Sequence, residues 1–304
     1  MLSVGVATFR RESLAATLGS LARQTLRPDR VIVADNDEHP SARALCEAAA
    51  RDGLPITYRH APARNICIAR NACLDAAAGG RLAFIDDDET AAPDWLERMS
   101  AALKDGLAGV SGPSIAVYPD DAPGWMRVLS PHSQTPPRIH GRQLTGHTAN
   151  CLLDLRHSAL SGLRFDPRFG RTGGEDADYF ARACRRGAVF GEAAACVFEP
   201  VPPERLDEAW LAARRRRAGQ TWYESLGPER RVKAVAAAPK ALWCRAGAAL
   251  SPSLLARRRA WLRGLFHEGV LAAARGVRPQ NHYGGAGEGG QAAPSSQTLP
   301  DRSR

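Results

Sequence analysis

The chain has 304 residues, of which 44% are hydrophobic and 24% charged. This is the composition of an ordinary globular protein, and it excludes a wholly disordered chain, a coiled coil and a collagen-like fibre. The formal net charge is +9, and it originates in residues 204–278, where 16 Lys and Arg face 6 Asp and Glu. Because this positive charge is local, nucleic acid and an anionic membrane surface are both candidate partners.

Seven cysteines occur, and no Cys-x-x-Cys pair is among them. Their apolar surroundings predict free buried thiols in a reducing cytoplasm, and the lack of a tight Cys and His cluster argues against zinc. The chain opens directly on an apolar run typical of a buried strand, so we expect no signal peptide. The most apolar long segment, residues 232–250, is interrupted by charges and by Pro239, which argues against a membrane-spanning helix.

Strand-like and helix-like patterns alternate through the first hundred residues. Short apolar runs without polar alternation predict parallel strands covered on both faces, at residues 2–7, 30–34, 56–59 and 82–85. Segments with apolar side chains at helical spacing lie between and after them, at residues 12–26, 41–52, 65–78 and 93–103. The alternation predicts an α/β fold with a doubly wound, mostly parallel sheet.

The next hundred residues are less regular. Residues 111–145 are rich in Pro, Gly and polar side chains, which indicates either an irregular insertion over a site or a plain long loop. Beyond them we expect a strand, a helix and a last strand, at residues 150–155, 173–186 and within 189–198.

A proline-rich break at residues 200–203 separates this part from the basic C-terminal third. This C-terminal third has a helical pattern that is interrupted by Pro239 and Pro252. From about residue 276 the chain is rich in Gly, Ser and Pro, which predicts disorder. We therefore expect three parts: an α/β domain, a basic helical extension and a disordered tail, at residues 1–203, 204–275 and 276–304.

Four acids, Asp86–Glu89, come directly after the strand predicted at 82–85. Ligands of open α/β sheets bind at the carboxyl ends of strands. Adjacent carboxylates repel one another unless a cation is present, and their oxygens suit Mg²⁺ or Mn²⁺. A solvated acidic turn that caps the next helix explains the same residues equally well.

A second acidic group, Glu175, Asp176 and Asp178, follows two glycines at the start of the helix predicted at 173–186. Capping of the helix is the plain explanation, because its amino end favours negative charge. The functional alternative is a general base, since a carboxylate there can accept a proton from an incoming hydroxyl.

Two Ala-Arg-Asn sequences place Arg64 and Arg70 at the helix predicted at 65–78. An arginine beside the acidic turn can bind a diphosphate through two hydrogen bonds, whereas a surface arginine on an amphipathic helix is the ordinary alternative. No G-x-G-x-x-G and no P-loop sequence occurs, so nicotinamide dehydrogenases and P-loop NTPases lack their main signature.

Taken in order, these motifs resemble family 2 glycosyltransferases of the GT-A fold. The shared motifs are a strand followed by T-F-R, a strand ending in Asp35, A-R-N-I-C-I-A-R-N-A, F-I-D-D-D-E-x-x-x-P-x-W-L and F-D-P-R-F-G-x-x-G-G-E-D-A-D. The sequences A-R-N-I-C-I-A-R-N and F-I-D-D-D-E are similar to those of bacterial exopolysaccharide enzymes of the succinoglycan glucosyltransferase type. The resemblance covers residues 2–200 and implies a GT-A catalytic domain.

The resemblance also implies where a nucleotide-activated sugar binds. Thr8 and Arg10 match the loop that lines the nucleotide, and Asp35 matches the acid that contacts the uracil base. Arg64 and Arg70 match basic positions near the nucleotide.

Asp86, Asp87 and Asp88 match the D-x-D region of that family. Asp86 and Asp87 are then nucleotide-sugar contacts, with Asp87 at the ribose. Asp88 falls at the position of the acid that binds the divalent cation, Mn²⁺ or Mg²⁺.

The catalytic base implied by the resemblance is Asp176, the second acid of the E-D pair. Glu175, Asn150 and Arg156 match the acceptor side. Departing UDP develops negative charge that the cation and an arginine stabilise, and the sugar carbon passes through an oxocarbenium-like state. Deprotonation of the acceptor by Asp176 from the opposite face inverts the anomeric centre.

The implied reaction is transfer from a nucleotide-sugar, usually a UDP-sugar, to a saccharide or polyprenyl-diphosphate-linked acceptor in exopolysaccharide or cell-surface glycan synthesis. Processive synthases of the family carry Q-x-x-R-W and transmembrane helices, whereas Gln220–Tyr223 reads Q-T-W-Y. A single addition is therefore expected. The alternatives are a nucleotidyltransferase acting on a sugar phosphate, which should have a glycine in the loop Ala7–Arg11, and a non-catalytic sugar-nucleotide-binding protein, which should have lost one of the acidic motifs.

The basic extension interleaves arginine clusters with Trp210, Trp222, Trp243 and Trp261. This pattern is typical of helices that lie on an anionic membrane, and it suits a peripheral enzyme on the inner face of the cytoplasmic membrane. A helical subdomain packed on the catalytic domain is the alternative. We expect no nucleic-acid partner, because no recognition motif of that class is present.

Overall fold

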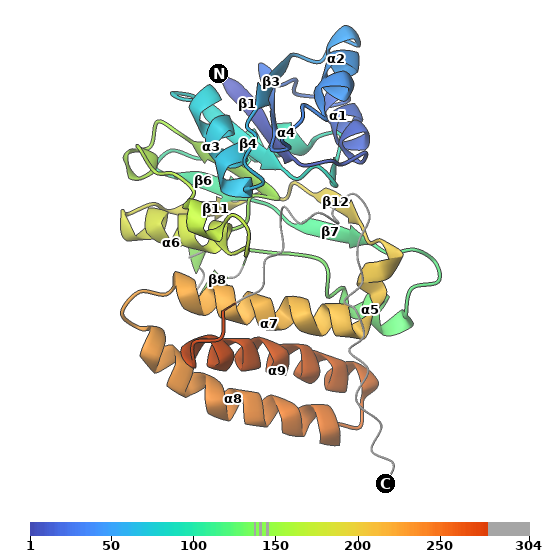
Figure 1. The fold of residues 1–304 in the computed structure, drawn as a ribbon, viewed down its shortest axis with the longest axis vertical. Helices are drawn as coiled ribbons and strands as arrows, with labels where there is room; N and C mark the ends of the chain where they lie inside the picture. Colours follow the sequence, from blue (N-terminus) through green and yellow to red (C-terminus); the bar gives the residue numbers. More distant parts are fainter. Residues whose placement is uncertain (137, 140–141, 144–145, 279–304) are drawn as a thin grey trace.

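The computed structural model describes residues 1–136, 138–139, 142–143 and 146–278. A part built around a sheet occupies one half of the molecule, and three long C-terminal helices occupy the other (Figure 1). Most of the segment expected to be a disordered tail, residues 276–304, lies outside the described residues.

The main sheet has the strand order β3-β2-β1-β4-β10-β6-β11-β9-β8. Its first four strands are parallel: β1 (Leu2–Thr8), β2 (Arg30–Asp35), β3 (Ile56–His60) and β4 (Arg81–Ile85). β10 (Asn150–Asp154) is antiparallel to β4 and β6 (Gly109–Ser111), and β11 (Phe190–Glu192) is parallel to β6. The short strands β9 (Arg142–Gln143) and β8 (Arg138–Ile139) complete the edge. The expected mostly parallel α/β sheet is confirmed.

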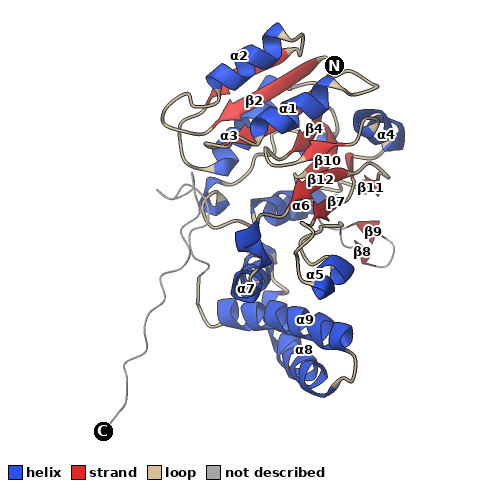
Figure 2. Cartoon of the chain, turned by 90° about the vertical axis from the view of Figure 1, so that its right-hand side faces the viewer, coloured by secondary structure: helices blue, strands red, loops and turns tan. Residues whose placement is uncertain are grey.

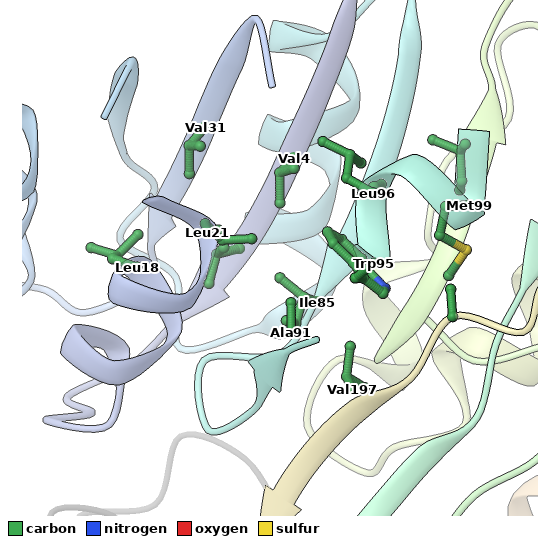
Figure 3. Packing of buried hydrophobic residues seen from close by; sticks show 14 of the residues in the cluster. Val4, Leu18, Leu21, Val31, Ile85, Ala91, Trp95, Leu96, Met99 and Val197 are labelled. Carbon is green, nitrogen blue, oxygen red and sulfur yellow. The ribbon is translucent and has the colours of Figure 1, made fainter. Parts of the chain in front are cut away.

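Helices cover both faces of this sheet, because successive strand residues point to opposite sides. Val4 and Val31 face a core shared with α1 (Leu14–Ala22), α2 (Arg43–Arg51) and α4 (Trp95–Ala102). Figure 3 shows this core, with Trp95 lying between the strands and α4. Ile32 and Phe84 face a second core shared with α3 (Ile66–Ala76) and α6 (Glu175–Arg185). The seven cysteines are free thiols and five are buried, as expected.

A second, three-stranded sheet lies beside the first and consists of β5 (Thr90–Ala91), β12 (Val197–Pro200) and β7 (Ser114–Val117). It differs from the sequence expectation in two ways. The segment 111–145 is partly regular, since it holds β7 and α5 (Gly124–Leu129). The segment 189–198 contributes to two strands, β11 and β12, which belong to different sheets. Short 3-10 helices at Ser158–Leu160, Pro167–Phe169 and Pro203–Leu206 occupy the connections.

The C-terminal extension consists of α7 (Glu208–Ser225), α8 (Arg230–Leu250) and α9 (Leu254–Ala274). α7 lies nearest the sheet, α9 packs on α7, and α8 is outermost (Figures 1 and 2). Pro252 separates α8 from α9, but the expected break at Pro239 is wrong because α8 continues through it. Pro239 is exposed, so its ring meets solvent instead of a neighbouring helix. In the part of the chain that the structure describes, no helix combines the length and apolarity needed to cross a membrane.

Two glycines allow α7 and α9 to approach closely. A Cβ on Gly219 would lie 2.0 Å from the Phe266 carbonyl oxygen, and one on Gly269 would lie 1.9 Å from that of Arg216. Gly219→Ala should therefore lower the free energy of unfolding by about 1–3 kcal/mol through overpacking, more than the ~1 kcal/mol that alanine gains in helix propensity. Thermal melts should show the loss for Gly219→Ala but not for Gly227→Ala, a position with open space around it. Equal melting temperatures would contradict the close packing.

Candidate active site

The acidic turn Asp86–Glu89 directly follows β4, where the carboxyl ends of β1, β2 and β4 form one edge of the sheet. Glu89 is buried, and its carboxylate shapes the turn by accepting hydrogen bonds from the Asp86 amide, at 3.1 Å, and the Ser114 hydroxyl, at 2.5 Å. Glu89 therefore caps this turn and not the next helix. The helix-capping interpretation does not apply to it, and the three aspartates are presented at the sheet edge.

Asp86 and Asp87 are unfavourable places for negative charge. Burial raises the pKa of Asp86 to about 6, and the neighbouring Asp88 adds to the effect while Arg70 opposes it. Burial and Asp88 raise the pKa of Asp87 to about 7, although Asp87 accepts a 2.7 Å hydrogen bond from the Thr8 hydroxyl. The 38% of the Asp86 side chain that stays exposed leaves this crowded carboxylate open to a cation, which would relieve the repulsion.

Asp88 faces the C-terminal extension. Its carboxylate lies 3.5 Å from the guanidinium of Arg205, a residue of the short helix Pro203–Leu206. Arg205 also pairs with Glu199 at 2.5 Å and stacks over the Trp210 ring. The first residues after the proline-rich break therefore contribute directly to the acidic edge.

Arg70 joins the two acidic motifs. It projects from α3 and is 97% buried, since only 3% of it is exposed. Its guanidinium donates to Glu175 at 2.5 Å, Asp176 at 3.0 Å and Asp86 at 3.3 Å. Burial, followed by the nearby Asp176 carboxylate, raises the pKa of Glu175 to about 7, and Arg70 works against this rise. The buried Arg70 guanidinium is therefore shared by acids from two distant parts of the sequence, Asp86 and the pair Glu175 and Asp176.

The local sequence around α3 explains why Arg70 is held so firmly. The Asn65 side chain caps α3 by accepting from the Cys67 amide and also donates to the Pro167 carbonyl. Asn71 exchanges two hydrogen bonds of 2.9 Å with the backbone of Phe165. The two asparagines of the A-R-N repeats thus fasten α3 to the loop that leads into α6.

Asp176 lies in the first turn of α6. Gly174 is the N-cap residue of this helix and has a φ of 93°. The Thr148 hydroxyl donates to it at 2.8 Å and the Thr148 amide at 3.2 Å. With Arg70, three donors engage a carboxylate that has about four acceptor positions. The side chain is 24% exposed. Asp176 is therefore oriented by Arg70 and Thr148 and is still accessible, so its position is compatible with proton transfer.

The residues matched to the nucleotide form a separate group beside the turn. Arg10 pairs with Asp37 at 2.8 Å, and Arg64 pairs with Glu38 at 3.0 Å. Both arginines have positive φ, 53° and 45°, a conformation uncommon outside glycine that accumulates at functional sites. Asp35 is fully buried, and its carboxylate accepts from the Asp37 and Ala42 amides and the Tyr58 hydroxyl.

The residues matched to the acceptor side do not form one group. Asn150 is fully buried, accepts from the Trp95 indole and donates to the Pro113 and Ala195 carbonyls. These hydrogen bonds tie the segments of Trp95, Pro113 and Ala195 together beside Ile85, the strand partner of Asn150. Arg156 instead follows the opposite end of β10 and pairs with Asp154. Glu175 lies at the site but is buried against Arg70.

Sequence reasoning missed Thr148, Arg205 and His147. Thr148 and His147 lie two and three residues before β10, whose first residue Asn150 is paired with Ile85, so they reach the same edge as Asp86. His147 is 8% exposed, and neither of its ring nitrogens has a hydrogen-bond partner among the described residues. Burial lowers its pKa. Positions before a strand that reverses direction carry no sequence signal, so these residues required the topology.

The structure thus places acids at the carboxyl edge of an α/β sheet and an oriented carboxylate on a helix that faces it. The sequence profile of glycosyl transferase family 2 matches residues 3–167. The chain is also 43% identical over 297 residues, 93% of its length and 96% of the relative's, to the succinoglycan biosynthesis protein ExoM of Rhizobium meliloti (strain 1021). The chain belongs to glycosyl transferase family 2 and is a glycosyltransferase.

Solved structures share the fold. The mannosyltransferase PcManGT from Pyrobaculum calidifontis, in complex with GDP-Man and Mn²⁺, superposes with a TM-score of 0.61 at 17% identity, covering 90% of this chain and 86% of its own. S. aureus TarS 1–349 in complex with UDP gives a TM-score of 0.50 at 16% identity, covering 91% of each chain. The expected GT-A fold is therefore confirmed, and family membership decides against a nucleotidyltransferase.

Proposed function

We propose that this protein is an inverting glycosyltransferase that transfers one sugar from a UDP-sugar to a hydroxyl of a glycan acceptor, with Asp176 as the general base. The observation that carries the proposal is the buried Arg70, which links Asp176 at 3.0 Å and Asp86 at 3.3 Å. The Arg70 guanidinium thereby sets the distance between Asp86 on the donor side and the proposed base. The bound UDP of TarS and the GDP-Man of PcManGT support a nucleotide-sugar donor.

We propose Asp88 as the acid that holds a divalent cation, Mn²⁺ or Mg²⁺. The donor set fits, because it consists of hard carboxylate oxygens crowded so closely that burial and mutual repulsion raise the pKa of Asp86 and Asp87. Among the described residues, no three ligating side chains converge on one point. Ions of the Mg²⁺ type commonly bind through one or two carboxylates together with substrate phosphates. When bound, the ion would stabilise the negative charge that develops on the leaving diphosphate.

The nucleotide is proposed to lie along the ends of β1 and β2. Thr8 and Arg10 line it, Asp87 contacts the ribose, and Arg64 borders the base. Asp35 is fully buried, so it acts on this side of the site by holding the backbone of Asp37 and Ala42. The Thr8 hydroxyl and Asp87 are hydrogen bonded at 2.7 Å, so the ribose contact is positioned before the donor arrives. Preorganisation of this kind reduces the entropy lost on binding.

The proposed chemistry assigns one role to each side of the sugar. Asp176 accepts the proton of the acceptor hydroxyl as that oxygen forms a bond to the anomeric carbon. The bond from this carbon to the phosphate oxygen breaks, and its electron pair leaves with UDP. Thr148 and Arg70 hold the Asp176 carboxylate in place throughout. Attack from the face opposite UDP inverts the anomeric centre, and no covalent sugar–enzyme intermediate forms.

The acceptor is proposed to be a saccharide, carried on a polyprenyl diphosphate, in exopolysaccharide synthesis. The support is the 43% identity to the succinoglycan biosynthesis protein ExoM over nearly the whole chain. A lipid-linked acceptor is consistent with an enzyme at the inner face of the cytoplasmic membrane, and the net charge of +9 suits an anionic surface.

A donor screen tests the proposed reaction. The purified protein is incubated with several UDP- and GDP-sugars, with Mn²⁺, with Mg²⁺ and with EDTA, and release of the nucleoside diphosphate is measured. We expect release from a UDP-sugar that depends on the divalent cation. Cation-independent release, or release from no donor, would contradict the proposal.

Arg205 is expected to stabilise the departing diphosphate, since its guanidinium lies 3.5 Å from Asp88. Removing one preorganised donor of this kind costs about 10²–10³ in turnover, so Arg205→Ala should lower kcat by about 10²-fold and Arg205→Lys by less. Steady-state kinetics measure both. Arg258→Ala is the matched control, because Arg258 also pairs with an acid, Glu208, and stacks on the Trp125 ring, but forms no ion pair with the acids of the turn. Equal kcat in all variants would show that Arg205 is structural.

A further inference from the structure

The outermost helix, α8, carries a row of apolar side chains that face solvent. The row consists of side chains that are 70–82% exposed: Val232 70%, Val235 75%, Leu242 70%, Trp243 82% and Leu250 82%. At about 100° per residue, they fall with exposed Pro239 and Ala246 into one stripe about 100° wide. We refer to this stripe as the apolar face of α8.

The opposite side of the same helix is the one that packs on the protein. Ala234, Ala237, Ala241 and Cys244 are buried there, and α8 packs on α9. The fold therefore uses one side of α8, and the apolar face contributes nothing to that packing. Such a helix, apolar on two sides, is not explained by the helical bundle alone.

Cations border the apolar face on both sides. Arg231 and Arg245 fall along one edge and Lys233 and Lys240 along the other, at helical spacing, and all four are exposed. The sequence of α8, from Arg230 to Leu250, contains five Lys and Arg and no Asp or Glu. This arrangement, an apolar stripe between two rows of positive charge, is that of a helix lying in a membrane interface.

The tryptophans of the extension support the same assignment. Trp210 stacks with His132, Trp222 contacts Phe266, and Trp261 packs edge-on against Trp125. These three serve the packing of the extension, which corrects the idea that all four tryptophans form one surface. Trp243 is the member of the set that points outward, and tryptophan favours the boundary between headgroups and acyl chains.

We propose that the apolar face of α8, with its four flanking cations, is the surface by which this protein lies on an anionic bilayer. The charges favour this occupant over a second copy of the chain, because two such faces would oppose cations to cations. The inference rests on the proposed function in that it gives a lipid-linked acceptor its surface. It places α6, the helix that carries Asp176, beyond α9 and α7, on the opposite side of the extension from the bilayer (Figures 1 and 2).

Vesicle flotation of the full-length protein tests the surface. The probes are phosphatidylcholine vesicles with and without a quarter of phosphatidylglycerol, at low salt and at 1 M salt. We expect wild type to float with the anionic vesicles at low salt. Binding should fall as the Debye length shrinks from about 10 Å at 0.1 M to about 3 Å at 1 M. Wild-type protein that stays in solution with anionic vesicles at low salt would overturn the proposal.

Two double variants separate the two components of the surface. Leu242→Gln with Trp243→Gln removes the apolar part, and Lys240→Gln with Arg245→Gln removes half of the flanking charge. Each should lower vesicle binding by about tenfold or more. The matched control is Val117→Gln with Val128→Gln, two exposed valines, 47% and 64%, outside the extension. Its binding should equal that of wild type, and a loss as large as in the α8 variants would overturn the assignment.

Nucleoside diphosphate release and sedimentation velocity distinguish failure of the membrane surface from failure of the proposed reaction. Release of nucleoside diphosphate from free donor should be unchanged in all of these variants, because none of the substituted residues lies at the acidic edge. Loss of vesicle binding with normal release would thus confirm the surface, whereas normal release without vesicle binding in wild type would refute it and leave the proposed reaction intact. Sedimentation velocity supplies the last outcome: a dimer that dissociates in Leu242→Gln with Trp243→Gln would identify a second copy as the occupant and contradict the proposal.

Discussion

Replacing Asp176 with Asn should abolish most sugar transfer while donor binding survives. The amide has nearly the shape of the carboxylate and can still accept from Thr148, but it cannot take a proton at neutral pH. Loss of a placed general base lowers the rate by about 10²–10⁴. We therefore expect kcat to fall by that factor, and the dissociation constant for UDP, measured by calorimetry with Mn²⁺, to change little.

The control is Asp178→Asn on the same first turn of α6. Asp178 pairs with Arg182 and contacts none of the site residues described above. If the acids of this turn served to cap the helix, both variants would lower the melting temperature and neither would lose transfer selectively. Turnover of Asp176→Asn within a few fold of wild type would contradict its role as the base.

Asp88→Ala should remove the dependence of donor binding on the divalent cation. Loss of a group that merely orients a metal ligand costs 10–100-fold in affinity, so loss of a direct ligand should weaken Mn²⁺-dependent UDP binding by at least about tenfold. The fold should survive, because Asp88 is 24% exposed and lines a surface edge rather than the core. Calorimetry of UDP with and without Mn²⁺ measures the difference.

Asp94→Ala is the matched control for Asp88→Ala. Asp94 lies six positions further on, is 40% exposed and pairs with Arg98 at the start of α4. It should bind UDP and Mn²⁺ as wild type does. Unchanged affinity in Asp88→Ala would contradict its role as the cation ligand and assign the cation to other acids of the turn.

The elements that the sequence predicted well are those with a strong local pattern. β1, β2 and β4 are continuous apolar runs, and the acids that follow β4 could be placed at the sheet edge because parallel strands end together. The A-R-N and G-G-E-D motifs pointed to Arg70 and to the acids at the start of α6, and the family resemblance singled out Asp176. Neither showed that Arg70 bridges Asp176 and Asp86, because that contact depends on how α3 and α6 pack.

The features that could not be predicted depend on contacts between distant segments. Arg205 reaches Asp88 only because the Pro203–Leu206 helix returns to the acidic turn. Thr148 meets Asp176 because β10 runs antiparallel to β4. Pro239 was expected to break a helix, but the packing of Ala237 and Ala241 against the bundle maintains α8 across it. For Pro239, tertiary packing overrides the local preference of the residue.

The stereochemistry of transfer tests the central claim most directly. A small alcohol such as methanol stands in for the acceptor, because the glycoside it forms does not equilibrate between anomers, and NMR of the product reports its configuration. With an α-linked UDP-sugar and Mn²⁺, the account predicts the methyl β-glycoside from wild type and little product from Asp176→Asn. A methyl α-glycoside would contradict single displacement with Asp176 as the base.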